Sequence, residues 1–212
     1  MLDQGVPRAV KDFHALTDAH LQRVLALLSA KEPSPPSPAG STEHAQAAVS
    51  LVLRTTADLE LMLIKRAVSE LDPWSGHMAL PGGRRDPTDR DLEHTAVRET
   101  AEETGVELGS HGWRLGRLEE LTPSTNRLPL LTIAPYVFGV PDHTTASANS
   151  HEVESVMWVS IDTLRDPGTR GATTIDLADG RRVFPCFRVE GHAVWGLTFR
   201  ILTDFLETVE EL

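Results

Sequence analysis

Apolar residues near the start of the chain recur at helical spacing. Between residues 10 and 30 the set comprises Phe13, Leu16, Leu21, Val24, Leu25 and Leu28, a spacing that places side chains on one helix face. The polar face has no excess of Lys and Arg, so we expect this face to pack on the protein body rather than on a membrane. Residues 32–42 are too rich in proline to be helical. We therefore predict a helical extension at 1–31, a Pro/Ser-rich linker at 32–42 and a folded domain at 43–212.

The folded domain begins with segments that are typical of β-strands. Residues 47–55 and 59–67 are β-rich runs separated by Ala57 and Asp58, which favours a hairpin. Further strands are predicted at 113–121, 131–140, 155–161, 173–177 and 182–189. The dipeptide Asp179-Gly180 is a turn signal between the last two of them.

Helical periodicity returns at three places in this domain. Residues 91–104 offer Leu92, Ala96 and Val97 for packing, and a terminal helix is predicted from about Leu197 to Val209. Between them, Asp162 is a good N-cap for a short helix. Strands with embedded helices predict an α/β fold in which a mixed sheet lies between helical layers.

Composition restricts the classes of function. A length of 212 residues allows one domain with an ordinary core plus some additional chain. The formal net charge of −11 argues against non-specific binding to nucleic acid, which needs clustered Lys and Arg.

Cysteine and histidine usage, and the lack of targeting segments, narrow the picture further. A single cysteine, Cys186, excludes an internal disulfide, and its strand-like surroundings predict a core residue rather than a nucleophile. The nine histidines lack the spacing of zinc ligands. No secretory signal or membrane-spanning apolar run is evident, so we expect a cytoplasmic protein.

Three carboxylates near the end of the predicted helix 91–104 are the strongest sign of chemistry. Glu99, Glu102 and Glu103 project within one arc of a helix. They repel one another there, so a cation is expected to neutralise them. All-oxygen ligation favours Mg²⁺ or Mn²⁺ over zinc. The alternative is a solvated acidic face, but Gly82-Gly83 before the helix allow close backbone approach to a metal or phosphate.

At these residues the chain resembles the Nudix box, G-x5-E-x7-R-E-U-x-E-E-x-G-U, in which U is aliphatic. The matching residues, in order, are Gly83, Arg98, Glu99, Glu102, Glu103, Gly105 and Val106. Asp89 stands at the position of the first Glu, eight rather than seven residues separate it from Arg98, and Thr100 replaces the first aliphatic residue. We interpret the shorter side chain and the extra residue as a compensated change before the helix.

Upstream, the chain resembles the branch of Nudix enzymes that cleaves coenzyme A. That branch carries the motif L-L-T-x-R-S-[SA]-x3-R-x3-G-x3-F-P-G-G, and the matching residues here are Leu63, Arg66, Gly76, Pro81, Gly82 and Gly83. Asp72 replaces an Arg of the motif, which reverses the charge at that position.

The resemblance implies an α/β/α Nudix sandwich and hydrolysis of a diphosphate that links a nucleoside to another group. It implies metal ligation by Glu99, Glu102, Glu103 and the Gly83 carbonyl, with Arg98 orienting Glu99. Glu102 has a second possible role as the hydrogen-bond partner of the attacking water. Glu152 is the candidate for general base or further ligand, and its alternative is a solvated loop charge.

Substrate-binding candidates lie around the same segment. Lys65, Arg66 and Arg84 are candidates for gripping phosphates, with Gly82 allowing close approach; for Arg84 and its neighbour Arg85 the alternative is an ordinary surface charge. Trp74 has three interpretations: stacking on an adenine, lining a pantetheine channel, or plugging an edge of the core.

These features lead to one principal hypothesis and two alternatives. The principal hypothesis is a Mg²⁺- or Mn²⁺-dependent hydrolase of coenzyme A or acyl-coenzyme A, releasing 3′,5′-ADP and (acyl-)4′-phosphopantetheine. The second is a Nudix hydrolase of ADP-ribose, NADH or a dinucleoside polyphosphate, which Asp72 favours. The third, a non-catalytic nucleotide-binding module, is disfavoured because all three box glutamates are present. A homodimer is plausible because Nudix proteins often pair.

Overall fold

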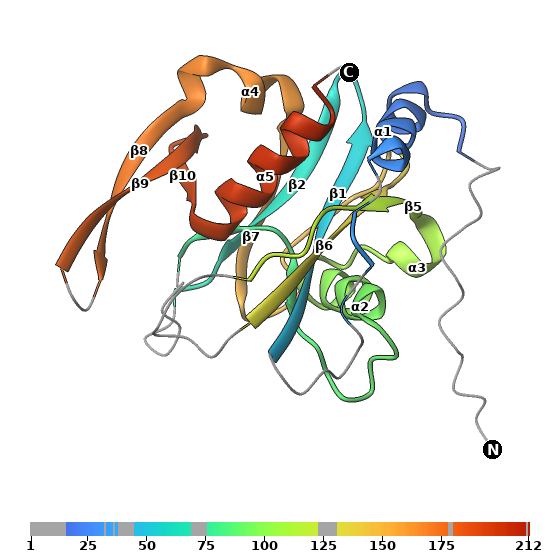
Figure 1. Cartoon of the computed structure of the whole chain (residues 1–212), viewed down its shortest axis with the longest axis horizontal. Coiled ribbons are helices and arrows are strands. Elements are labelled where there is room, and N and C mark those ends of the chain that lie inside the picture. The colour runs from blue at the N-terminus through green and yellow to red at the C-terminus, as the bar shows by residue number, and fades with distance from the viewer. Residues whose placement is uncertain are drawn as a thin grey trace.

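A seven-stranded mixed sheet forms the centre of the protein in the computed structural model, which describes residues 16–31, 33–35, 37, 45–68, 76–122, 131–177, 180–210 and 212 (Figure 1). Five strands lie across it in the order β3 (Met78–Ala79), β2 (Leu59–Arg66), β1 (Ala45–Thr55), β6 (Leu131–Gly139) and β5 (Trp113–Arg117). In addition, β4 (Gly82–Arg84) pairs with β1, and β7 (Val153–Ser160) pairs with β2. Because β1 and β6 are parallel while the other pairs are antiparallel, the sheet is mixed, as predicted.

Alternation along the central strands gives the sheet two apolar faces. Leu51 and Leu53 of β1 belong to one buried cluster, and Val52 between them belongs to the other. In β2, Leu61 and Leu63 face the first cluster and Met62 the second. This is the period of two that a strand imposes on its side chains, so both faces must be covered.

Helices cover both faces. Helices α2 (Leu92–Thr104) and α3 (Leu108–His111) supply apolar side chains to the cluster around Val52. On the other face lie α1 (Ala19–Ala30), α4 (Ile161–Arg165) and α5 (Gly196–Thr208). The predicted α/β/α sandwich is therefore confirmed.

A second, three-stranded sheet packs beside α5. It consists of β10 (His192–Trp195), β9 (Gly180–Val189) and β8 (Arg170–Leu177), preceded by the 3₁₀-helix η2 (Pro167–Thr169). The β8–β9 hairpin confirms the predicted pairing and extends away from the main sheet in Figure 1, although turn residue Asp179 lies outside the described residues. Cys186 on β9 is fully buried, as expected for a core residue.

The N-terminal helix packs on the body. Asp18 caps α1, and Leu21, Val24 and Leu28 are buried in the cluster that also contains α5; Phe13 lies outside the described residues. Within the described ranges, no helix has both the length and the apolar character needed to cross a membrane. The division into extension, linker and domain remains a proposal.

Three details differ from the predictions. Helix α4 is capped by Ser160, whose hydroxyl accepts from two backbone N–H groups, so Asp162 lies inside the helix rather than at its N-cap. Gly82 and Gly83 lie in the short strand β4 rather than in a loop. Strand β5 ends at Arg117, and Leu121 forms only an isolated bridge with β6.

Candidate active site

Helix α2 is fixed at both ends by capping residues. The Asp91 carboxylate accepts a hydrogen bond from the backbone N–H of His94 at 2.7 Å, as an N-cap residue does. Gly105 ends the helix in the left-handed conformation, with φ +72°, where glycine is favoured. The apolar side of α2 buries Leu92 and Ala96 against the sheet. The helix is therefore held firmly enough to place its carboxylates.

The double glycine of β4 lies directly against two of these carboxylates. The backbone N–H of Gly82 donates to Glu103 Oε2 at 2.8 Å. A Cβ at Gly83 would lie 2.5 Å from the carboxyl group of Glu99. A side chain at Gly83 would therefore displace the Glu99 carboxylate, whereas one at Gly82, with φ +150°, would meet the Ala48 carbonyl oxygen at 2.3 Å. Glycine is thus required sterically at Gly82, and the strand brings its backbone into contact with the acidic side of α2.

Asp89 has a defined role despite its departure from the box pattern. It is buried and accepts hydrogen bonds from Arg98 Nε and Nη2 at 3.0 and 2.9 Å. It also bonds the Thr95 hydroxyl, the Asp86 N–H and His94 Nδ1. Burial opposes its ionisation, but these donors hold the pKa of Asp89 well below its usual range. The shorter side chain is therefore fully accommodated.

Arg98 links this network to the acidic cluster. Its Nη1 donates to Glu99 Oε1 at 2.9 Å and to Glu102 Oε2 at 3.0 Å. Because Asp89 fixes the other side of the guanidinium, Arg98 can orient Glu99, as predicted for it. Glu102 is the most exposed of the three box carboxylates.

The cluster is electrostatically unfavourable as it stands. Burial is the main reason that the pKa of Glu103 is raised to about 7; the charges of Glu99 and Glu152 contribute to the rise, and the Gly82 hydrogen bond and Arg66 oppose it. Burial also raises the pKa of Glu99, opposed by Arg98 and reinforced by Glu102 and Glu152. Glu152 acts on both groups, so the fold brings it to the cluster from the start of β7. Carboxylates held in this way favour a cation.

The donor set fits a hard divalent ion. Among the described residues, no three acidic, histidine or cysteine side chains by themselves form a ready cluster for a metal. Mg²⁺, however, typically retains water and needs only one or two carboxylates together with phosphate oxygens. Glu99, Glu103 and the Gly83 carbonyl could supply such a set, because Glu99 adjoins Gly83 and Glu103 adjoins Gly82.

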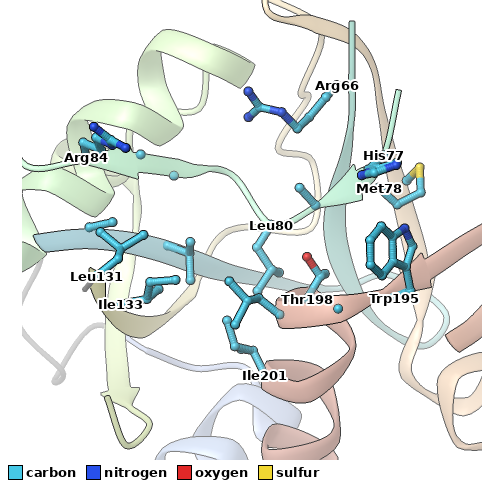
Figure 2. Close-up of a pocket in the computed structure, with 17 residues that line it drawn as sticks. Arg66, His77, Met78, Leu80, Arg84, Leu131, Ile133, Trp195, Thr198 and Ile201 are labelled. Carbon is cyan, nitrogen blue, oxygen red and sulfur yellow. The ribbon is translucent and has the colours of Figure 1, made fainter. Parts of the chain in front are cut away.

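A cavity of about 310 Å³ opens beside the glycines, and three of the predicted substrate-binding residues, Arg66, Gly82 and Arg84, line it. Figure 2 shows Arg84 and Leu131 on one side of the cavity and His77 and Trp195 on the other, with Arg66 above and Ile133 and Ile201 below.

The remaining candidates lie elsewhere. Lys65 forms an ion pair with Glu154 at 2.7 Å. Arg85 donates to the Asp89 carbonyl. Trp74 and Asp72 lie outside the described residues.

The wall of the cavity contains residues that the sequence alone did not single out. His77 lies directly before β3, and its ring contacts that of Trp195, with the ring centroids 4.9 Å apart. Thr198 and Ile201 of α5 complete the wall. They come from a helix more than 100 residues after the glycines, so no local pattern around the glycines indicates them.

Comparison with known proteins places these features in a family. The NUDIX domain model matches residues 44–176, which is more than half of the chain. A human mitochondrial coenzyme A diphosphatase is 34% identical over 134 residues, covering 61% of this chain and 54% of that protein. An uncharacterised Schizosaccharomyces pombe protein is 36% identical over 131 residues, 60% of this chain and 40% of its own length. This chain thus spans about half the length of these two relatives.

Other relatives match over most of their length. An uncharacterised Nudix hydrolase, NudL, of Yersinia enterocolitica is 28% identical over 193 residues, 89% of this chain and 93% of that protein. The predicted resemblance to the Nudix family and its coenzyme A diphosphatase-like branch is confirmed by these relatives.

Solved structures establish the fold. A Caenorhabditis elegans Ap4A hydrolase has a TM-score of 0.50 at 18% identity, covering 79% of this chain and 99% of that one. The NUDIX domain of Shewanella oneidensis NrtR, solved with ADP ribose, has a TM-score of 0.51 at 18% identity, covering 83% of this chain and 92% of that one. The predicted Nudix fold is confirmed, and with the family match over residues 44–176, the chain belongs to the NUDIX domain family.

Proposed function

We propose that this protein is a metal-dependent hydrolase that cleaves the diphosphate of coenzyme A or acyl-coenzyme A into 3′,5′-ADP and (acyl-)4′-phosphopantetheine. The observation that carries the proposal is the contact between the Gly82-Gly83 strand and the carboxylates of half-buried Glu99 and buried Glu103. A backbone carbonyl and two carboxylates beside an open cavity suit a diphosphate that arrives with its metal.

Glu99, Glu103 and the Gly83 carbonyl would hold Mg²⁺ or Mn²⁺. When bound, such an ion neutralises phosphate charge and acidifies an attacking water. Glu103 must be ionised to act as a ligand, and its raised pKa means that ligation and loss of its proton are coupled.

The remaining box residues position and transfer protons. Asp89 holds Arg98, and Arg98 holds Glu99 at the correct angle. Glu102 accepts a hydrogen bond from Arg98, but its side chain is exposed. It can therefore rotate towards the metal as a ligand or towards the attacking water as a hydrogen-bond partner. Glu152, coupled to Glu99 and Glu103, is the proposed general base.

Coenzyme A is favoured as substrate by two observations. The human relative is a mitochondrial coenzyme A diphosphatase, and Arg66 of the upstream motif lines the cavity next to the glycines. The Arg66 guanidinium would provide a phosphate contact beside the glycines. Lys65, Arg84 and Trp74 remain proposed substrate contacts, the last in a segment outside the described residues.

The test is a turnover panel. Purified protein with Mg²⁺ or Mn²⁺ is incubated with coenzyme A, ADP-ribose, NADH and a dinucleoside polyphosphate, and products are identified by mass. We expect 3′,5′-ADP and 4′-phosphopantetheine from coenzyme A. If another diphosphate is hydrolysed while coenzyme A is hydrolysed only at the background rate, that compound becomes the proposed substrate. The proposed metal-dependent hydrolysis of a diphosphate would still stand.

Asp72, which reverses a charge of the motif, supports the second candidate, a hydrolase of another nucleoside diphosphate derivative. A non-catalytic nucleotide-binding module is the third; binding of substrate without turnover by the wild-type protein would favour it. The homodimer and the cytoplasmic location remain predictions, and analytical ultracentrifugation tests the first of them.

A further inference from the structure

We infer that the cavity between β4 and the start of α5 binds the pantetheine arm of the substrate rather than its nucleobase. This inference rests on the proposed function and adds which half of the substrate the protein encloses. It makes the cavity the part of the site that distinguishes coenzyme A from other diphosphates.

The cavity is contiguous with the acidic cluster. Gly82 and Gly83 line it, and the same two residues contact Glu103 and Glu99 on α2. A group bonded directly to a diphosphate at these carboxylates therefore lies next to this cavity. In coenzyme A, the two groups bonded to the diphosphate are the adenosine and the pantoyl end of pantetheine.

The chemistry of the wall favours the aliphatic group. The side chains of the wall are mostly aliphatic, including Val49, Leu80, Leu131, Ile133 and Ile201, and the rings of Trp195 and His77 pack on each other. An adenine ring carries donors and acceptors around its edge, and burial against such side chains would leave them without partners. The pantoyl group has two methyl groups close to its phosphate, and their burial here is favourable.

Polar groups lie at the rim, where the amides of pantetheine could reach them. Thr198 and His77 carry the polar side-chain atoms on the α5 and β3 sides (Figure 2). Helix α5 begins at Gly196, and its N-cap residue is Trp195. An indole N–H only donates, so it cannot accept from the first N–H groups of the helix. Gly196, Leu197 and Thr198 line the cavity, so the N-terminal turn of the helix adjoins the bound arm.

Among the residues that line the cavity, the arginine side chains lie beside the glycines. Arg66 and Arg84 lie above the glycine strand, and Leu80, Ile133 and Ile201 lie below it (Figure 2). The 3′-phosphate of the adenosine half would be placed against aliphatic side chains if that half entered the cavity, at a large cost in desolvation. The charge distribution thus fits a diphosphate at the mouth and an uncharged arm inside.

A substitution that fills the cavity tests which of the two products, 4′-phosphopantetheine or 3′,5′-ADP, binds there. Thr198→Phe places a ring in the cavity, and Thr163→Phe, on the exposed surface of α4, is the matched control. Binding of 4′-phosphopantetheine and of 3′,5′-ADP in the presence of Mg²⁺ is measured by calorimetry, alongside hydrolysis of coenzyme A. Leu131→Phe, at the half-buried edge of the cavity, is the second variant if the first fails to fold by circular dichroism.

We expect Thr198→Phe to weaken binding of 4′-phosphopantetheine at least about tenfold, to raise the KM for coenzyme A similarly, and to leave 3′,5′-ADP binding within about twofold. Thr163→Phe should match the wild type in all three. Selective loss of 3′,5′-ADP binding, or equal affinities in wild type and both cavity variants, would overturn the inference while coenzyme A turnover by the wild type keeps the proposed function. Absence of coenzyme A turnover by the wild type would instead remove the function.

Discussion

The two ends of helix α2 hold buried carboxylates in opposite electrostatic states. Asp89, before the helix, is 1% exposed, and Glu103, in its last turn, is 4% exposed. Donors surround Asp89, and its pKa lies well below the usual range. Burial with few donors raises the pKa of Glu103 to about 7. Burial alone therefore does not set the ionisation of a carboxylate; the number of donors around it does.

This difference separates a structural carboxylate, Asp89, from one that is proposed to bind a metal, Glu103. The Asp89 network is complete, because Arg98, His94, Thr95 and a backbone N–H satisfy both of its oxygens. Glu103 has one backbone donor and two acidic neighbours, so a further positive charge would stabilise it. The comparison predicts that substitutions at the two ends change different properties.

The largest expected effect is on catalysis at the Glu103 end. Glu103→Gln removes a proposed ligand charge without changing size, so hydrolysis should fall to background, at least about 10³-fold below wild type. The measurement is steady-state turnover of the best substrate from the panel with saturating Mg²⁺. Near-wild-type turnover in both this variant and Glu102→Gln would refute the metal assignment.

At the other end, Asp89→Ala should act on stability. It leaves the guanidinium of Arg98 without its principal buried partner, and breaking such a pair costs about 3 to 5 kcal/mol. Urea unfolding at pH 7, followed by circular dichroism, gives the difference in the free energy of unfolding between Asp89→Ala and wild type. Asp89→Asn, which keeps the size and some hydrogen bonds, is the control and should lose less. Equal stability of Asp89→Ala and wild type would show that the network is not structural.

The pH dependence of the metal-free protein sharpens the comparison. The folded-state pKa of Glu103, about 7, exceeds its unfolded value, so its contribution to stability is fully present below about pH 4.5 and is lost as pH rises through 7. In EDTA, wild type should therefore lose on the order of 2 to 3 kcal/mol between pH 5 and 8 relative to Glu103→Gln. Denaturant unfolding at both pH values provides the measurement. A constant difference between the two proteins would contradict the assigned pKa, and Mg²⁺ should restore stability selectively to wild type.

The smallest effect is expected at the surface pair of Lys65 and Glu154. Both side chains are partly exposed, and such pairs contribute less than about 1 kcal/mol, so Lys65→Met should leave the unfolding free energy almost unchanged. A several-fold rise in the KM of the same variant would support Lys65 as a phosphate contact. An unchanged KM would remove it from the substrate site.

Local patterns in the sequence predicted much of this arrangement. The box helix and the mixed sheet follow from short-range periodicity, and both are present. The completeness of the Asp89 network could not be predicted, because His94 and Thr95 join it only through the exact phase of the first helical turn. The wall formed by Trp195, Thr198 and Ile201 could not be predicted either, because it depends on how α5 packs on a sheet whose strands are distant in sequence.

The parallel pairing of β1 with β6 has a consequence for how the site forms during synthesis. Ala47 of β1 pairs with Arg84 on one side and with Ile133 on the other, so the strand beneath the glycines is flanked only after residue 133 has left the ribosome. The box carboxylates at 99–103 exist earlier, but α5, which walls the cavity, is made last. Pairing over such sequence separations is slow. A nascent chain therefore carries the acidic helix before it carries the wall that α5 contributes to the cavity.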